Sequence, residues 1–114
     1  MIKVTVLYNL PPGTDEEEFL AWRMGPHNER NNADPNVLKS DFYRIVGTPA
    51  VGPDRPAAST SPWRFVTEAY YESIEDFESA WNAPQEQERL ANAFTRIADA
   101  VVLVSEELQS HSNQ

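Results

Sequence analysis

Side chains that exchange protons near neutral pH are scarce in this sequence, which has two histidines and no cysteine. His27 directly follows Gly25-Pro26, a pair that interrupts or kinks a helix. Because histidine titrates near neutral pH, His27 is the leading candidate for a general acid or base. A structural role stays open, in which His27 caps the preceding helix or hydrogen-bonds a loop carbonyl. His111 belongs to a polar C-terminal stretch, where we expect a solvated side chain.

Glu68 and Tyr70 form a second pair of candidates, on one face of a predicted strand over Trp63–Glu72. The apolar residues of this strand alternate with them and are expected to pack on helices, so the pair faces an enclosed space on the other side. Partial desolvation raises the pKa of a carboxyl group and suits it to proton transfer, and a tyrosine hydroxyl can orient a carbonyl group. The alternative for Glu68 is an ion pair with Lys3 or Arg44 on neighbouring strands.

Other side chains have the shape or the hydrogen-bonding groups to hold a substrate. Aromatic rings supply flat walls for a ligand, although aromatic residues at these spacings also fit core positions. Asn9 ends the first strand and can donate to an oxyanion, or it begins the turn into Pro11-Pro12-Gly13. The predicted substrate-binding residues are Asn9, Trp22, Tyr43 and Trp63, with Tyr8 and Tyr70 as further candidates for a ligand wall.

The charge balance argues against two classes of partner. The chain of 114 residues carries 18 acidic and 9 basic side chains, a formal net charge of -9. Nucleic-acid binding depends on Lys and Arg side chains that neutralise phosphates, and an anionic membrane surface attracts basic segments in the same way. We therefore predict neither partner. The sequence has no recognisable signal peptide and no apolar run of roughly 18 residues, so we expect a cytoplasmic protein.

The sequence also contains no recognisable cofactor-binding motif. The glycines are scattered and form no phosphate-binding loop. Asp15-Glu16-Glu17-Glu18 is an acidic run, but consecutive helical residues point in different directions, and negative charge at a helix start fits the helix dipole. The lack of cysteine excludes disulfides, iron–sulfur clusters and thiol catalysis. We predict no cofactor and no metal, and haem stays open with His27 as its axial ligand.

Strand and helix patterns follow one another in the order strand, helix, strand, strand, helix, strand. Thr14 stands three residues before Glu17, the spacing of a capping box, and predicts the start of the first helix. Ser73 caps the second helix, which restarts at Pro84. The loop over residues 47–62 contains four prolines and is either a flap near a pocket or a plain connector. The predicted strands are Ile2–Leu10, Val37–Val46, Trp63–Glu72 and Ala100–Ser105.

This order predicts an α+β, ferredoxin-like domain, βαββαβ, with a four-stranded antiparallel sheet and helices on one face. We expect one domain over residues 1–108 and a disordered tail over residues 109–114. The face without helices carries side chains too apolar to face water, among them Leu7, Phe42, Val66 and Tyr70. A second copy of the chain in an isologous two-fold contact is the simplest cover, so we predict a homodimer.

Four segments, taken in order, carry a resemblance to a known group of proteins. They are Met1–Tyr8, the pair Phe19 and His27 with Trp22 between them, Glu68–Phe77, and Ala83–Gln87. Together they resemble EthD-like proteins of the dimeric α/β-barrel superfamily, a group that includes the RedY-like and HapK-like proteins of prodigiosin-type pathways. The resemblance covers most of the chain, from Met1 to about Glu106, and is more specific for the fold than for the reaction.

The resemblance implies that two ferredoxin-like subunits pack sheet against sheet and that each half of the barrel encloses a pocket. It places His27 at the position of the family's helix 1 histidine, which faces the pocket and serves as acid or base in some isomerase-like relatives. Gly25-Pro26 departs from the family pattern, in which the helix more often continues. The wider group includes muconolactone-type isomerases, cofactor-free monooxygenases, polyketide cyclases and haem-degrading enzymes, so the fold alone does not decide the function.

We therefore expect a small enzyme that needs no cofactor and binds a mostly apolar, oxygenated ring compound, such as a lactone, a phenol or a polyketide-like intermediate. The reaction would be an isomerisation, a cyclisation or an oxygenation, with His27 as acid or base and with Glu68, Tyr70 or Asn9 orienting the substrate. The alternative is a non-catalytic carrier or accessory protein of a catabolic or pigment-type secondary-metabolite pathway. A third interpretation is a structural dimer whose barrel is filled and has no pocket.

Overall fold

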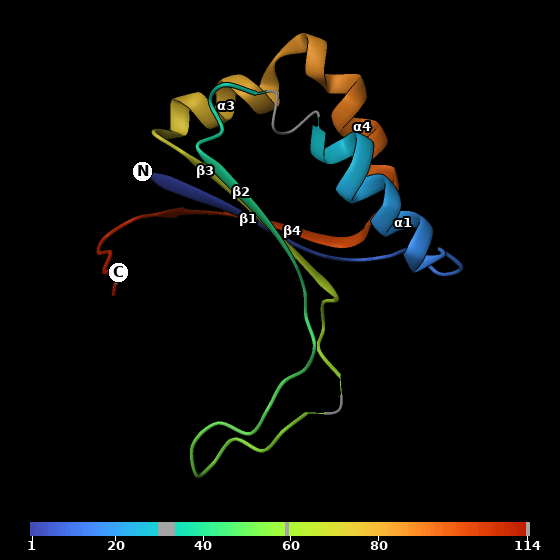
Figure 1. The fold of residues 1–114 in the computed structure, drawn as a ribbon, viewed down its shortest axis with the longest axis vertical. Helices are drawn as coiled ribbons and strands as arrows, with labels where there is room; N and C mark the ends of the chain where they lie inside the picture. The colour runs from blue at the N-terminus through green and yellow to red at the C-terminus, as the bar shows by residue number, and fades with distance from the viewer. Residues whose placement is uncertain (30–33, 59, 114) are drawn as a thin grey trace.

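The structure is a computed structural model that describes residues 1–29, 34–58 and 60–113. Its elements follow the predicted order (Figure 1). The strands are β1 (Ile2–Asn9), β2 (Lys39–Arg44), β3 (Phe65–Tyr71) and β4 (Ala98–Glu106). The helices are α1 (Glu16–Trp22), α3 (Ile74–Asn82) and α4 (Gln87–Thr95), with a π-helical turn over Arg23–His27 and a 3-10 turn over Pro84–Glu86.

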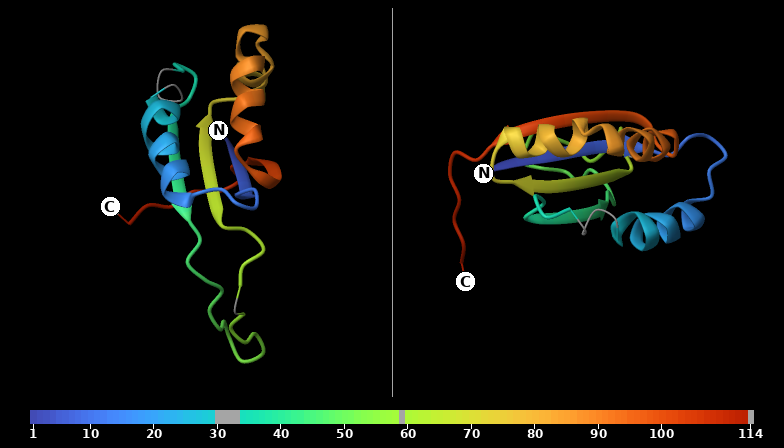
Figure 2. Two further views of the ribbon diagram at one scale, coloured as in Figure 1. Left: turned by 90° about the vertical axis from the view of Figure 1, so that its right-hand side faces the viewer. Right: turned by 90° about the horizontal axis from the view of Figure 1, so that it is seen from above.

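The four strands form one antiparallel sheet in the order β2-β3-β1-β4. The helices of the described residues lie on one face of this sheet, with α1 over its β2–β3 side and α4 over its β1–β4 side (Figures 1 and 2). Strands β1 and β3, the central pair, come from distant parts of the chain, as the split βαβ arrangement requires. The α+β class, the antiparallel four-stranded sheet and the ferredoxin-like topology are therefore confirmed.

The core lies between the sheet and the helices and is centred on Phe65, which has no exposed surface. Alternate residues of a strand face the same side, so Val4, Val6 and Tyr8 of β1 are all turned toward the helices and buried. The ring centroid of Phe65 lies 5.8 Å from that of Tyr8 and 5.5 Å from that of Phe19 in α1. These aromatic contacts hold α1 on the sheet.

The first helix starts one residue later than the capping-box spacing predicts. Asp15, not Thr14, is the N-cap of α1, and its Oδ1 accepts hydrogen bonds from the backbone N–H groups of Glu17 (2.9 Å) and Glu18 (3.2 Å). A carboxylate suits this position because its charge also interacts favourably with the helix dipole. The predicted cap of the next helix is confirmed, since Ser73 Oγ accepts the backbone N–H three residues further on at 3.2 Å.

All four strands have bounds that differ from the predicted ranges, and β1 differs only in ending at Asn9 and not at Leu10. β2 and β3 are shorter than the predicted ranges 37–46 and 63–72, because each begins and ends at most two residues inside the predicted limits. β4 is longer than the predicted range 100–105, because it pairs with nearly the whole of β1. The pairing continues past an irregularity between Leu7 and Asn9, beside which Asp99 adopts a positive φ of 55°. An irregularity of this kind depends on contacts across the sheet and leaves no local pattern in the sequence.

The sheet face without helices is called the open face below. Its side chains change from apolar to polar along the strands. One row of register partners across all four strands is apolar and consists of Val101, Leu7, Val66 and Tyr43. The row of Ser105, Lys3, Tyr70 and Lys39, further along, is polar. The expectation that Phe42 belongs to the open face is wrong, because its register partner Thr67 lies on the helix-facing side.

The connection between β2 and β3 is a long hairpin over residues 45–64, called the arm below. The arm projects beyond the sheet and away from the helices (Figure 1). Its described residues include an isolated bridge between Thr48 and Ala58 and a backbone hydrogen bond from Ile45 N–H to the Arg64 carbonyl at 2.8 Å. In this structure the arm does not lie over the helical layer (Figure 1), and whether it acts as a flap or as a plain connector stays a prediction.

The end of the chain carries little regular structure. Beyond Glu106 no helix or strand forms up to residue 113, and Gln114 lies outside the described residues. The domain limits at residue 108 and the disordered tail over 109–114 stay predictions. In the described ranges, no helix is both long enough and apolar enough to cross a membrane.

The central position of Phe65 leads to a stability prediction. F65A should lower the free energy of unfolding by about 3–5 kcal/mol, because the substitution removes buried apolar surface and leaves a cavity. Urea denaturation followed by circular dichroism measures the change. Val46 is 94% exposed, so V46A is the control and should change the free energy by less than about 0.5 kcal/mol. Equal effects of the two substitutions would contradict this account of the core.

Candidate functional site

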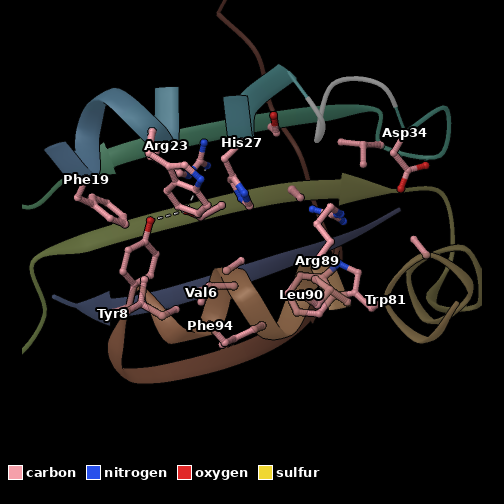
Figure 3. Close-up of a pocket in the computed structure, with 18 of the residues that line it drawn as sticks. Val6, Tyr8, Phe19, Arg23, His27, Asp34, Trp81, Arg89, Leu90 and Phe94 are labelled. Atoms are coloured by element: carbon pink, nitrogen blue, oxygen red, sulfur yellow. Dashed lines mark hydrogen bonds between the residues drawn. The ribbon is translucent and has the colours of Figure 1, made fainter. Parts of the chain in front are cut away.

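A cavity of about 120 Å³, called the pocket below, lies between the sheet and the helices. Strands β1 and β3 form its floor, and α1, α3, α4 and the segment after α1 form its walls (Figure 3). Most of the wall is apolar and comes from side chains such as Phe19, Trp22, Trp81, Leu90 and Phe94. Polar side chains gather at two ends of this apolar surface, the arrangement typical of small-molecule sites.

One end of the pocket, called the Arg23 end below, is formed by Tyr8, Arg23 and Thr67. The Tyr8 hydroxyl and Thr67 Oγ1 lie 3.1 Å apart, and Arg23 Nη2 donates to Thr67 Oγ1 at 3.4 Å. Burial raises the pKa of Tyr8 above its ordinary 10.0, although the hydrogen bond with Thr67 and the charge of Arg23 oppose this shift. Tyr8 is therefore protonated at neutral pH and keeps a hydroxyl group that can donate.

The position of Arg23 follows from its spacing in the helical segment. It comes four residues after Phe19 and so lies on the same side as that buried ring. The Arg23 side chain is only 4% exposed, and its Cζ lies 4.4 Å from the centroid of the Phe42 ring in β2. A cation at this distance from an aromatic face is attracted to it. This contact places a permanent positive charge at the edge of the pocket.

His27 is positioned by the break at Gly25-Pro26. Gly25 has φ of -104° and ψ of -105°, outside the helical range, and Pro26 has no backbone N–H to donate. The predicted kink is confirmed, and beyond it the chain resumes helical geometry. The half-buried His27 lines the pocket, with its ring centroid 4.5 Å from that of Trp22 at an interplanar angle of 34°. Figure 3 shows the imidazole directed from this segment toward the sheet.

The opposite end of the pocket contains charges of both signs. Trp81 Nε1 donates to the Tyr71 hydroxyl at 3.3 Å. Burial raises the pKa of Tyr71, and the negative charge of Asp34 acts in the same direction. Arg89 also lines the pocket, and it forms an ion pair with Glu86. This end therefore differs from the Arg23 end, where the charged side chain is a cation.

The arrangement combines a base with hydrogen-bond donors around an apolar wall. His27 can accept or return a proton. Arg23 and the Tyr8 hydroxyl can donate to an oxygen atom on which negative charge develops. Within residues 1–29, 34–58 and 60–113 there is no cluster of three His, Asp or Glu side chains that could hold a metal ion.

The structure brings three of the predicted site residues to the pocket. His27, Trp22 and Tyr8 all line it. The Trp22 ring is also covered by the guanidinium of Arg96, whose Cζ lies 4.3 Å from the ring centroid. Trp22 therefore contacts both a cation and the His27 imidazole, and it forms part of the flat wall expected for a ring-shaped ligand.

Glu68 and Tyr70 lie on the open face, on the other side of the sheet from the pocket. Glu68 Oε1 is 3.7 Å from Lys3 Nζ, and the Tyr70 hydroxyl donates to Glu68 Oε2 at 3.4 Å. The ion pair with Lys3, one of the alternatives for Glu68, is therefore present, whereas Arg44 pairs with a carboxylate of α1. The structure does not bring Glu68 and Tyr70 together with His27, because neighbouring strand positions project to opposite faces.

Asn9, Trp63 and Tyr43 also lie away from the pocket. Asn9 Oδ1 accepts the backbone N–H of Arg64 at 2.8 Å, and Trp63 Nε1 donates to the carbonyl of Asp99 at 3.2 Å. Both side chains thus tie the base of the arm to the edge of the sheet. Tyr43 is 52% exposed on the open face. The Asn9 side chain also donates to the Pro62 carbonyl and to Asp99, and its roles at an oxyanion or in the turn into Pro11-Pro12-Gly13 stay predictions.

Several polar residues of the pocket are not singled out by the sequence, among them Arg23, Thr67 and Tyr71. A signal for Arg23 exists in its spacing from Phe19, which puts a charge on the apolar side of the helix. Thr67 alternates with apolar residues on the helix-facing side of β3, which is also unusual for a polar side chain. Each signal is a polar side chain at a position where the sequence pattern is otherwise apolar.

Several solved structures of other proteins have the same fold as this chain. An EthD family protein from Bacillus halodurans is 21% identical, with a TM-score of 0.71 over 95% of this chain and 99% of its own. HapK from Hahella chejuensis is 18% identical, with a TM-score of 0.73 over 100% and 99%. A hydroxynitrile lyase from Passiflora edulis is 15% identical, with a TM-score of 0.75 over 97% and 96%.

A dimeric ferredoxin-like protein of unknown function from Thermobifida fusca also matches, with 16% identity and a TM-score of 0.66 over 93% of this chain and 90% of its own. No protein-family model and no curated protein sequence matches the chain. At these identities the similarity establishes the fold. The chain has the ferredoxin-like fold of EthD-like and HapK-like proteins, as the resemblance of its sequence segments implies.

The buried tyrosines of the pocket predict how stability depends on pH. The folded-state pKa of Tyr8 lies above its ordinary 10.0, so the folded protein holds this proton where the unfolded chain has lost it. Stability should therefore fall as the pH rises above about 10, toward the folded-state pKa. Y8F should make this fall shallower, and adding Y71F should make it shallower still, because the pKa of Tyr71 is raised as well.

Urea denaturation midpoints between pH 8 and pH 11 measure this dependence for the wild type, Y8F and Y8F/Y71F. Each protein is compared with its own midpoint at pH 8, so that the effect of removing a hydroxyl group on stability is separated from the effect of pH. If the slopes of the three proteins coincide, burial does not hold the proton on Tyr8.

Proposed function

We propose that the pocket binds a small, mostly apolar, oxygenated ring compound and that His27 transfers a proton on it without a cofactor. The observation that carries this proposal is the position of His27, which lines an aromatic cavity beside Trp22. The donors of the Arg23 end face the same cavity. A base and hydrogen-bond donors within one cavity are the groups that a proton transfer needs, whether the proton is on the carbon next to a carbonyl group or on a phenolic oxygen.

The apolar wall supports a ring-shaped ligand. Phe19, Trp22, Trp81 and Phe94 contribute aromatic surface, and Leu90 adds aliphatic surface. In such surroundings a proton transfer is little affected by bulk water, and hydrogen bonds to a developing negative charge are strengthened. Isomerisation, cyclisation and cofactor-free oxygenation of a lactone, a phenol or a polyketide-like compound all begin with a step of this kind.

The structures that share the fold agree with a small-molecule role. One of them is a hydroxynitrile lyase. At such low identity this match supports the fold alone, so the choice of reaction depends on the side chains of this chain.

We also propose that the chain forms a homodimer through its open face. The apolar row of Val101, Leu7, Val66 and Tyr43 crosses this face, and Leu103 beside it is 46% exposed. One of the solved structures with this fold is dimeric. A two-fold contact between open faces would bury this row on both copies and leave the pocket on the outer, helical side of each sheet.

The enzymatic proposal is tested by hydrogen exchange at carbon. Lactones, phenols and enolisable cyclic ketones are incubated with the protein in D2O, and NMR measures the rate at which protons next to the carbonyl group or on the phenol ring are replaced. The wild type should accelerate exchange for at least one of these compounds. H27A should lower the accelerated rate at least roughly a hundredfold, which is the scale of lost general acid–base catalysis.

H111A is the matched control, because His111 lies in the exposed C-terminal segment outside the pocket. It should exchange at the wild-type rate. An exchange rate in H27A equal to that of the wild type would remove His27 from the mechanism. Compounds that bind, as a thermal shift indicates, but are recovered without exchange or conversion would support a carrier protein in place of an enzyme.

The dimer is tested by charge placed on the open face. L103E should shift the protein from dimer to monomer in analytical ultracentrifugation, because burying an unpaired carboxylate in a contact is costly. L108E, which alters a leucine that is 87% exposed in the C-terminal segment, is the control and should leave the mass unchanged. A wild-type protein that sediments as a monomer at micromolar concentrations would contradict the proposed assembly.

A further inference from the structure

The Arg23 end contains a buried positive charge that no carboxylate of the described residues balances. Five other basic side chains, all more exposed than Arg23, form ion pairs with carboxylates in this part of the structure, and they are Lys3, Lys39, Arg44, Arg64 and Arg89. Arg23, which is only 4% exposed, takes part in none of these pairs. The usual pattern is the reverse, since buried charges are paired more strictly than surface charges.

The contacts of Arg23 compensate its burial only in part. Thr67 Oγ1 accepts one hydrogen bond at 3.4 Å, a long distance for an N–H donor, and the Phe42 ring lies against the guanidinium. The Tyr8 hydroxyl is a further hydrogen-bond partner, and none of these three groups carries a charge. The cation therefore remains at the edge of the pocket with spare donor capacity.

The spare donors have access to the pocket. Among the described residues no side-chain nitrogen is both fully buried and without a hydrogen-bond partner. Because Arg23 Nη2 is the donor to Thr67, any Arg23 nitrogen without a partner keeps some open surface, and Arg23 is a lining residue of the pocket. The groups around them are the hydroxyls of Tyr8 and Thr67, with the His27 ring further along the same wall. Asp34 lies toward the far end (Figure 3).

We infer that the ligand of this pocket is a ring compound with a carboxylate group and that Arg23 binds the carboxylate. This inference rests on the proposed function and narrows its substrate class. A guanidinium matches a carboxylate in charge and in the spacing of its donors. The ring would then lie along the apolar wall of Trp22, Leu90 and Phe94, within reach of His27. Arg23 is in this account a binding residue that selects for charge.

The experiment compares two probes that differ in charge and hardly in shape, benzoate and benzamide. A single ring suits a cavity of about 120 Å³. Isothermal titration calorimetry at pH 7 measures their dissociation constants for the wild type, R23M and R55M. Methionine keeps much of the length of the arginine side chain without its charge, and R55M removes an exposed arginine of the arm as a matched control.

Benzoate should bind the wild type and R55M at least roughly tenfold more tightly than benzamide, the difference expected of one charge-assisted hydrogen bond. R23M should lose this preference and bind the two probes alike. Without a probe, R23M should unfold at the same temperature as the wild type or at a higher one, because the substitution removes an unpaired buried charge. Benzoate should raise the unfolding temperature of the wild type and leave that of R23M unchanged.

Equal affinities of benzoate and benzamide for the wild type would overturn the role of Arg23 and leave the acid–base proposal for His27 standing. If R23M still binds benzoate more tightly than benzamide, the role of Arg23 is likewise overturned, and the acid–base proposal for His27 still stands. If R23M does not fold, Arg23 is needed for the structure, and the comparison of the two probes on the wild type decides alone. If neither probe binds the wild type, both this inference and the pocket as a ring-binding site are contradicted.

Discussion

The packing of Phe19 against Phe65 and Tyr8 is the contact on which the rest of the molecule depends. The ring of Phe65 is fully buried between the central strands and α1, and the ring centroid of Phe19 lies 6.2 Å from that of Tyr8 in an edge-on arrangement. This cluster fixes one end of α1 on the sheet. Beyond it the chain bends at Gly25 and leaves space between the sheet and the helices, and that space is the pocket.

The two faces of the sheet carry different side chains, because successive residues of a strand point to opposite sides. The helix-facing side supplies the core and the floor of the pocket, and the open face carries an apolar row followed by the Lys3–Glu68 pair. The proposed acid–base chemistry and the proposed dimer contact would thus use opposite sides of one sheet. A change on the open face can alter association without touching the groups around His27.

Much of the fold is readable from local patterns. Strand alternation, the Ser73 cap and the break at Gly25-Pro26 depend on residues close in sequence, and each is found in the structure as predicted. The start of α1 is misplaced by one residue because Thr14 and Asp15 are both good caps, and the competition between them is decided by backbone geometry. The extent of β4 depends on long-range pairing, which a local pattern does not contain.

The site is less readable than the fold. His27 and Trp22 are found from residue type and spacing, since both lie on the short segment that forms one wall. Glu68 and Tyr70 lie on the sheet face without helices, as the alternation of the strand predicts, whereas the cavity lined by His27 opens on the other face. The sequence does not show on which face a cavity opens. The spacing of Arg23 from Phe19 indicates a charge on the apolar side of the helix, but its contact with Phe42, a residue of β2, is not contained in a local pattern.

The arm has a consequence for how this chain tolerates change. Its described residues take no part in the pocket, and none of them belongs to the buried core. Loop-closure entropy rises only slowly with loop length, so insertions and deletions near its tip should be nearly neutral for folding. The length of this hairpin can therefore change while the helical layer, and with it the pocket, stays the same.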